Sequence, residues 1–117
     1  MRRKILVVDD EPLILKTIER ALEKVGYDIE TTEDMESFMR ALGGMSRPPD
    51  LLILDMNLGK LNTEQMIDRI RELAPQARML FISGSFPEVY DDRDFLEKPF
   101  RIDDLREKIK DMLDAPQ

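Results

Sequence analysis

The stretch DLLILD, residues 50–55, contains the strongest strand signal in the chain. Its four consecutive apolar residues indicate a strand buried on both faces, as strands of parallel sheets are. The run ends at an acidic residue, Asp55. A second run, ILVV at residues 5–8, is followed directly by Asp9 and Asp10. We therefore expect two buried strands that each deliver carboxylates at their carboxyl ends.

Outward from these two runs, strand and helix patterns alternate along the chain. Three weaker strands are expected at Tyr27–Thr31, Met79–Ile82 and Phe95–Leu96. Helices are predicted from Pro12 to Gly26, from Asp34 to Leu42 before Gly43-Gly44, from an Asn62 cap to Pro75, and over Arg101–Leu113. This alternation predicts an α/β fold with a parallel sheet and helices on both faces.

The helical spacing assigns an apolar face to each of the three longest helices. The expected core positions are Leu13, Ile14, Ile18, Ala21, Leu22 and Val25 in the first, Met66, Ile67, Ile70 and Leu73 in the third, and Ile102, Leu105, Ile109 and Met112 in the last.

Composition limits the classes of function. The 117 residues, 42% of them hydrophobic, fit a single domain over residues 1–117, without an output domain. A net charge of −7 argues against nucleic-acid binding. The chain has no Cys and no His, so any metal should be a hard cation held by oxygens. No apolar run approaches the roughly 20 residues of a membrane span, and we expect a cytoplasmic protein.

Polar residues gather at the expected strand ends: Asp9, Asp10, Asp55, Ser83 and Lys98. In parallel α/β sheets, ligands bind at the carboxyl ends of the strands. Neighbouring carboxylates repel unless they are protonated or hold a divalent cation. Lys98 and Ser83 suit a phosphoryl group, and Asp55 could act as a nucleophile that forms an acyl phosphate. Each element has a plainer explanation alone, as a helix cap, a turn or a loop, but the combination is far more specific.

The four stretches ILVVDDEP, DLLILDMNL, MLFISGS and FLEKPF, spread from Ile5 to Phe100, resemble the receiver domain of bacterial two-component response regulators, of the chemotaxis-receiver type. The resemblance implies a flavodoxin-like sheet of five parallel strands in the order 2-1-3-4-5, with helices on both faces.

The resemblance also implies roles for the site residues. Asp55 is expected to accept a phosphoryl group from a sensor histidine kinase or a histidine phosphotransfer protein. Mg²⁺ (or Mn²⁺) would be bound by Asp10, by Asp9 through water, by Asp55 and by the backbone carbonyl of Asn57. Lys98 would contact the phosphoryl group, with a cis Lys98–Pro99 bond.

Further residues are implied to transmit or time the signal. Ser83 would be the switch hydroxyl and Phe95 the switch aromatic. Asn57 and Ser85 stand where receivers tune dephosphorylation.

Two departures from the receiver pattern concern loops. Gly59 and Thr63 stand where receivers usually carry Pro and Gly. Only 14 residues separate Ser83 from Lys98, and Pro87 lies among them, although a parallel crossover normally takes a dozen or more residues with a helix. We therefore expect the fourth helix of receivers to be missing or reduced to a turn.

The leading hypothesis is a phosphoaccepting signalling domain of a phosphorelay, not an enzyme beyond its own phosphotransfer and autodephosphorylation. It would switch the surface that binds an unknown downstream protein. A homodimer is also possible, through the face that the fourth helix, fifth strand and fifth helix form in receivers and that should be altered here. The alternative is a receiver-like interaction module that works without phosphorylation. An aspartyl-phosphate phosphatase is disfavoured because Asn57 stands where such enzymes carry their acid.

Overall fold

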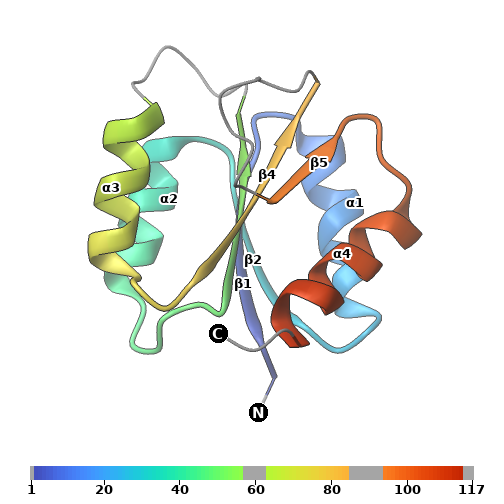
Figure 1. The fold of residues 1–117 in the computed structure, drawn as a ribbon, viewed down its shortest axis with the longest axis horizontal. Helices are drawn as coiled ribbons and strands as arrows, with labels where there is room; N and C mark the ends of the chain where they lie inside the picture. The colour runs from blue at the N-terminus through green and yellow to red at the C-terminus, as the bar shows by residue number, and fades with distance from the viewer. Residues whose placement is uncertain (1, 57–62, 85–93, 115–117) are drawn as a thin grey trace.

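The computed structural model describes residues 2–56, 63–84 and 94–114. They form a five-stranded parallel sheet in the order β2-β1-β3-β4-β5 (Figure 1). The strands are β1 (Lys4–Val8), β2 (Asp28–Thr32), β3 (Leu51–Asp55), β4 (Arg78–Ser83) and β5 (Asp94–Glu97). The helices among the described residues are α1 (Pro12–Glu23), α2 (Met35–Gly44), α3 (Thr63–Leu73) and α4 (Ile102–Asp114). The predicted fold class and strand order are confirmed.

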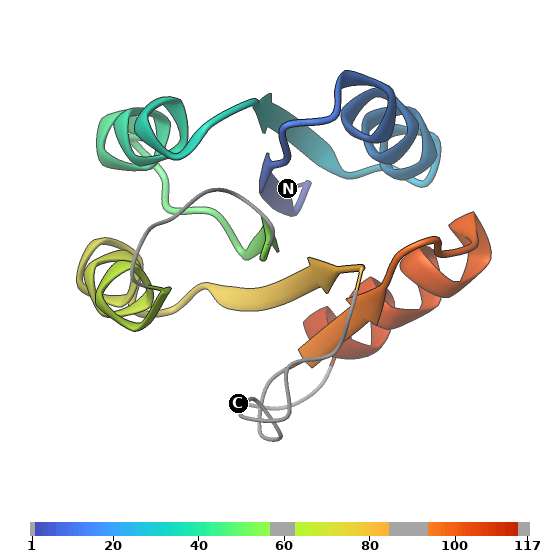
Figure 2. The same ribbon diagram turned by 90° about the horizontal axis from the view of Figure 1, so that it is seen from above.

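The sheet separates two helix layers, which Figures 1 and 2 show from two directions. Helices α1 and α4 cover one face, where Ile5 and Val7 of β1 are buried. Helices α2 and α3 cover the other, where Leu6 and Val8 are buried. Successive side chains of a strand point to opposite faces, so a strand between two layers must be apolar at every position. This explains the unbroken apolar runs of β1 and β3.

The register of the strands places their carboxyl ends at one edge of the sheet. Val8 pairs with Leu54, and Asp55 pairs with Ile82. The ladder continues past β5, where the Lys98 amide donates to the carbonyl of Ser83 at 2.7 Å. Residues from β1, β3, β4 and the end of β5 therefore meet at this edge, as the sequence predicted.

Several helix positions differ from the prediction. Leu13 is 80% exposed, whereas Leu15, which was not predicted, is buried. Val25 is 51% exposed and lies outside α1, which ends at Glu23 and not at the predicted Gly26. Leu15 shares a helix face with Ile18 and Leu22, while Leu13 lies two residues away, about 200° around the helix. Leu73 and Ile102 are also exposed, because they stand at the last and first positions of their helices.

The helix ends were predicted less accurately than the helices. Helix α2 is capped by Asp34, whose carboxylate accepts from the Ser37 amide at 2.7 Å, as expected for an N-cap. It runs through Gly43 and Gly44 instead of stopping before them. Gly26, after α1, has a φ of 98°, a left-handed conformation that favours glycine.

Some predictions concern residues outside the described ranges. The Asn62 helix cap and most of the link between Ser83 and Lys98 fall there. Strand β4 ends at Ser83 and β5 begins at Asp94, so the ten residues 84–93 join two adjacent parallel strands. The shortened fourth helix stays a prediction. None of the helices within residues 2–56, 63–84 and 94–114 has the length and apolar character that a membrane span requires.

Replacing Phe38 tests the α2 side of the core. Phe38 is fully buried, so Phe38→Ala should lower the free energy of unfolding by about 3–5 kcal/mol. Leu13→Ala is the matched control at the exposed position and should change it by less than about 0.5 kcal/mol. Urea unfolding followed by circular dichroism measures both. Equal losses in the two variants would contradict the assignment of these faces.

Candidate functional site

Three carboxylates meet at the carboxyl edge of the sheet. Asp9 and Asp10 follow β1, and Asp55 ends β3. One oxygen from each lies within 4.8 Å of the others. Asp9 and Asp55 are buried, while Asp10 is exposed and forms the open side of the cluster. The structure thus brings together the three acidic residues that the sequence singled out.

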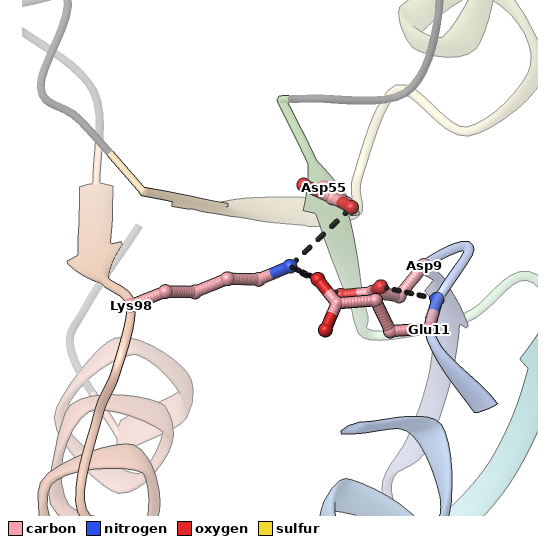
Figure 3. Close-up of polar contacts among 4 residues, drawn as sticks. All are labelled: Asp9, Glu11, Asp55 and Lys98. Atoms are coloured by element: carbon pink, nitrogen blue, oxygen red, sulfur yellow. Dashed lines mark hydrogen bonds and ion pairs between the residues drawn. The ribbon is translucent and has the colours of Figure 1, made fainter. Parts of the chain in front are cut away.

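Lys98 reaches into this cluster from the end of β5, as Figure 3 shows. Its Nζ lies 3.0 Å from Asp9 Oδ2, 3.4 Å from Asp55 Oδ2 and 3.2 Å from Glu11 Oε1. The Lys98 side chain is 11% exposed. The ammonium therefore offsets part of the negative charge that the strand ends bring together.

The protonation of Lys98 follows from these contacts. Burial acts to lower the pKa of Lys98, but the hydrogen bond to Asp9 and the negative charges around it outweigh burial. The pKa of Lys98 therefore lies above its ordinary value. Because the folded-state pKa is raised, Lys98 is charged at neutral pH, and the stability that its charge contributes is lost as the pH rises through that pKa.

Local hydrogen bonds hold the strand end of β1 in place. Asp9 Oδ1 accepts from the Glu11 amide at 2.9 Å, and the Asp9 amide donates to the Thr32 carbonyl at 3.2 Å. The Thr32 hydroxyl donates to the Val7 carbonyl at 2.7 Å. These bonds tie β1 to β2 and fix the Asp9 carboxylate, with its second oxygen toward Lys98.

The carboxylate oxygens fit a divalent cation. Asp9 Oδ2 and Asp55 Oδ2 are both buried, and each faces the Lys98 ammonium. Buried carboxylates need an accompanying positive charge, which a divalent cation can supply as well as an ammonium group. An all-oxygen donor set with one exposed member suits Mg²⁺, which keeps several waters and takes one or two protein carboxylates.

The predicted switch residues lie on the neighbouring strands. Ser83 is buried at the end of β4. Phe95, on β5, is partly buried, and its ring centroid lies 5.6 Å from that of Phe81 at an interplanar angle of 35°. The Lys98–Pro99 peptide bond is cis, as predicted.

Three of the singled-out positions lie beyond what the structure describes. Asn57, Ser85 and Gly59 all fall in the undescribed ranges. Thr63 is the first residue of α3.

The sequence analysis missed the role of Glu11. Glu11 is the N-cap residue of α1, but its side chain makes no capping hydrogen bond within the described residues. The Glu11 carboxylate pairs with Lys98 instead. The interpretation of the acidic run as a helix cap therefore does not apply to the Glu11 side chain. The only signal in the sequence was that a third acidic residue follows Asp9 and Asp10.

A family model described as the response regulator receiver domain matches residues 5–110. The chain belongs to this family. Receiver domains are the regulatory, phosphate-accepting parts of bacterial two-component systems, and they bind Mg²⁺ through acidic residues. The match covers every described element except Lys4 at the start of β1 and the last four residues of α4.

Relatives and solved structures agree with the assignment. The receiver domain is 30% identical over 121 residues to the alkaline phosphatase synthesis transcriptional regulatory protein PhoP of Bacillus subtilis, covering 97% of this chain and 49% of that protein. The chain thus spans about half the length of the curated relatives that it matches first.

Two solved structures show the same fold. A CheY-like receiver domain protein from Methanospirillum hungatei has a TM-score of 0.85 at 24% identity, covering 97% of this chain and 95% of that one. A response regulator from Burkholderia pseudomallei, solved with a phosphorylated aspartic acid, calcium ion and citrate, has a TM-score of 0.75 at 22% identity, covering 97% and 75%.

Removing the Lys98 ammonium tests the charge balance of the site. In metal-free buffer, Lys98→Met should lower the free energy of unfolding by about 1–3 kcal/mol, because two buried carboxylates lose their counter-charge while the site keeps some contact with water. Added Mg²⁺ should stabilise this variant more than the wild type. Denaturant unfolding with and without Mg²⁺ measures both effects.

The matched control is Lys108→Met. Lys108 pairs with Asp94 at 3.0 Å, but both side chains are substantially exposed. Its loss should cost less than about 1 kcal/mol and should not respond to Mg²⁺. Unchanged stability of Lys98→Met in metal-free buffer would contradict the charge balance described for this site.

Proposed function

We propose that this receiver domain accepts a phosphoryl group on Asp55 from a histidine kinase or a histidine phosphotransfer protein, in a Mg²⁺-dependent reaction. The observation that carries the proposal is the setting of Asp55. Asp55 is the last residue of the central strand β3. Its Oδ2 lies 3.4 Å from Lys98 Nζ, and its carboxylate belongs to the cluster with Asp9 and Asp10. Phosphoryl transfer needs positioning and positive charge more than any other protein chemistry.

The transfer step is a displacement at phosphorus. An Asp55 oxygen attacks, the new O–P bond forms, and the P–N bond of the phosphohistidine breaks. The imidazole nitrogen leaves with the electron pair and takes a proton from water. A Mg²⁺ ion bound by Asp9, Asp10 and Asp55 would supply positive charge to the phosphoryl oxygens. Lys98 would pair with a phosphoryl oxygen once Asp55 is modified.

The switch would pass through strands β4 and β5. We propose that the Ser83 hydroxyl moves to donate to a phosphoryl oxygen and that Phe95, packed near Phe81, changes position with it. Asn57 and Ser85 would set how fast water hydrolyses the acyl phosphate. The altered surface would bind a downstream protein, or a second copy of the chain. The domain would act as a regulatory phosphoacceptor in the cytoplasm, where kinases have ATP.

Phosphorylation by a small-molecule donor tests the proposal. Incubation with acetyl phosphate and Mg²⁺ should add the mass of one phosphoryl group to the wild type, as measured by intact-protein mass spectrometry. Asp55→Asn should gain none, because an amide oxygen cannot form the acyl phosphate. Leaving out Mg²⁺ should lower the yield by at least about tenfold, as expected when a metal ion stabilises the transferring charge.

The matched control is Asp68→Asn, which makes the same chemical change at an exposed position on α3. It should be phosphorylated like the wild type. Equal labelling of wild type and Asp55→Asn, or no labelling of the wild type by acetyl phosphate or by any histidine kinase, would refute phosphorylation at Asp55. The latter result would favour an interaction module that works without phosphate.

A further inference from the structure

Glu11 contacts Lys98 but does not belong to the carboxylate cluster. Glu11 Oε1 lies 3.2 Å from Lys98 Nζ, and the Glu11 side chain is 58% exposed. The cluster that could hold a metal ion consists of Asp9, Asp10 and Asp55 among the described residues. Lys98 therefore has two kinds of partner, the buried carboxylates of Asp9 and Asp55 and the exposed carboxylate of Glu11, all of which Figure 3 draws around its Nζ.

These two groups of partners respond differently to a cation. A divalent ion held by the cluster competes with the ammonium for Asp9 and Asp55, because both cations would need the same buried oxygens. The ammonium and the ion also repel each other at short range. Lys98 must then weaken two of its three ion pairs when the ion binds. Glu11 contributes no oxygen to the cluster, so its ion pair with Lys98 need not break.

We propose that Glu11 is a positioning residue that retains the Lys98 ammonium at the rim of the site when a divalent cation takes Asp9 and Asp55. The displaced ammonium keeps a carboxylate partner and stays beside Asp55, where an incoming phosphoryl group would meet it. Glu11 thereby lowers the cost of displacing Lys98 and strengthens cation binding without touching the cation. The proposal rests on the Mg²⁺ site of the proposed function.

Glu11 can be changed without disturbing the elements around it. Its side chain does not cap α1 within the described residues, so Glu11→Gln removes no capping bond. The bond that Glu11 does make to Asp9 uses the backbone amide, which the substitution keeps. Helix α1 also retains Pro12 at its first turn, which favours the helical start regardless of the residue before it.

The test measures the dissociation constant of Mg²⁺ alone, by amide shifts in NMR titrations of the whole chain. Glu11→Gln should weaken Mg²⁺ binding by roughly threefold to fivefold, the range of a partly exposed ion pair. Glu33→Gln is the matched control, since Glu33 is also exposed and follows β2 at the same edge of the sheet. At moderate salt, losing its charge should weaken binding by less than about twofold.

Repeating the titration in a Lys98→Met background distinguishes an effect of Glu11 through its ion pair with Lys98 from a direct effect of its charge on Mg²⁺. If Glu11 acts through Lys98, Glu11→Gln should weaken Mg²⁺ binding in that background no more than Glu33→Gln does. A full effect in the Lys98→Met background would overturn the proposal, because Glu11 would then act on the cation directly. Wild-type affinity in Glu11→Gln would overturn it too. Tighter Mg²⁺ binding by Glu11→Gln would overturn the proposal as well, because Glu11 would then stabilise Lys98 in the position that opposes the cation.

The outcomes also distinguish this proposal from the function on which it rests. A wild type that binds no Mg²⁺ at millimolar concentrations would overturn both. A wild type that binds Mg²⁺ and is phosphorylated on Asp55, together with a Glu11→Gln variant that matches the Glu33→Gln control, would overturn the role of Glu11 alone.

Discussion

The ion pairs between Lys98 and the buried carboxylates of Asp9 and Asp55 are the interaction on which the site depends. Carboxylates this deeply buried are costly unless an opposite charge accompanies them. The chain supplies that charge from the end of β5, more than forty residues after Asp55 along the sequence. The sheet must therefore form, with β5 in place beside β4, before the site is electrostatically balanced. The fold brings Lys98 to the carboxylates, and the charge of Lys98 lowers the cost of burying them.

The strand order explains why the site lies where it does. Strand β1 pairs with β2 on one side and with β3 on the other. The strands that follow β1 are therefore added first on one side of it and then on the other, although all strands run parallel. Such a change of side leaves the carboxyl ends of β1 and β3 open to a ligand. The ends of these two strands carry Asp9, Asp10 and Asp55, and the apolar residues before them have no part in the chemistry. Their burial between two helix layers holds the carboxylates rigidly at the edge.

The two central strands and the meeting of the acidic residues could be predicted from the residues themselves, because unbroken apolar runs have few alternatives in a chain of this size. The strand order followed only from the resemblance to receiver domains. The sequence predicted helix faces less well. Leu13 and Leu73 are apolar but exposed, because Leu13 lies on the solvent side of α1 and Leu73 is the last residue of α3. The Glu11–Lys98 contact could not be predicted, because the same acidic run also fits a helix cap. Which partner an exposed carboxylate chooses depends on tertiary structure.

A structure of the domain with Mg²⁺ and beryllofluoride tests the central claim most directly. The account predicts beryllofluoride on an Asp55 oxygen, a metal ion coordinated by that carboxylate and by Asp10, and Lys98 Nζ moved from Asp9 toward a fluoride while its contact with Glu11 remains. Beryllofluoride bound elsewhere, or a Lys98 that still pairs with Asp9 and Asp55 as in Figure 3, would contradict it.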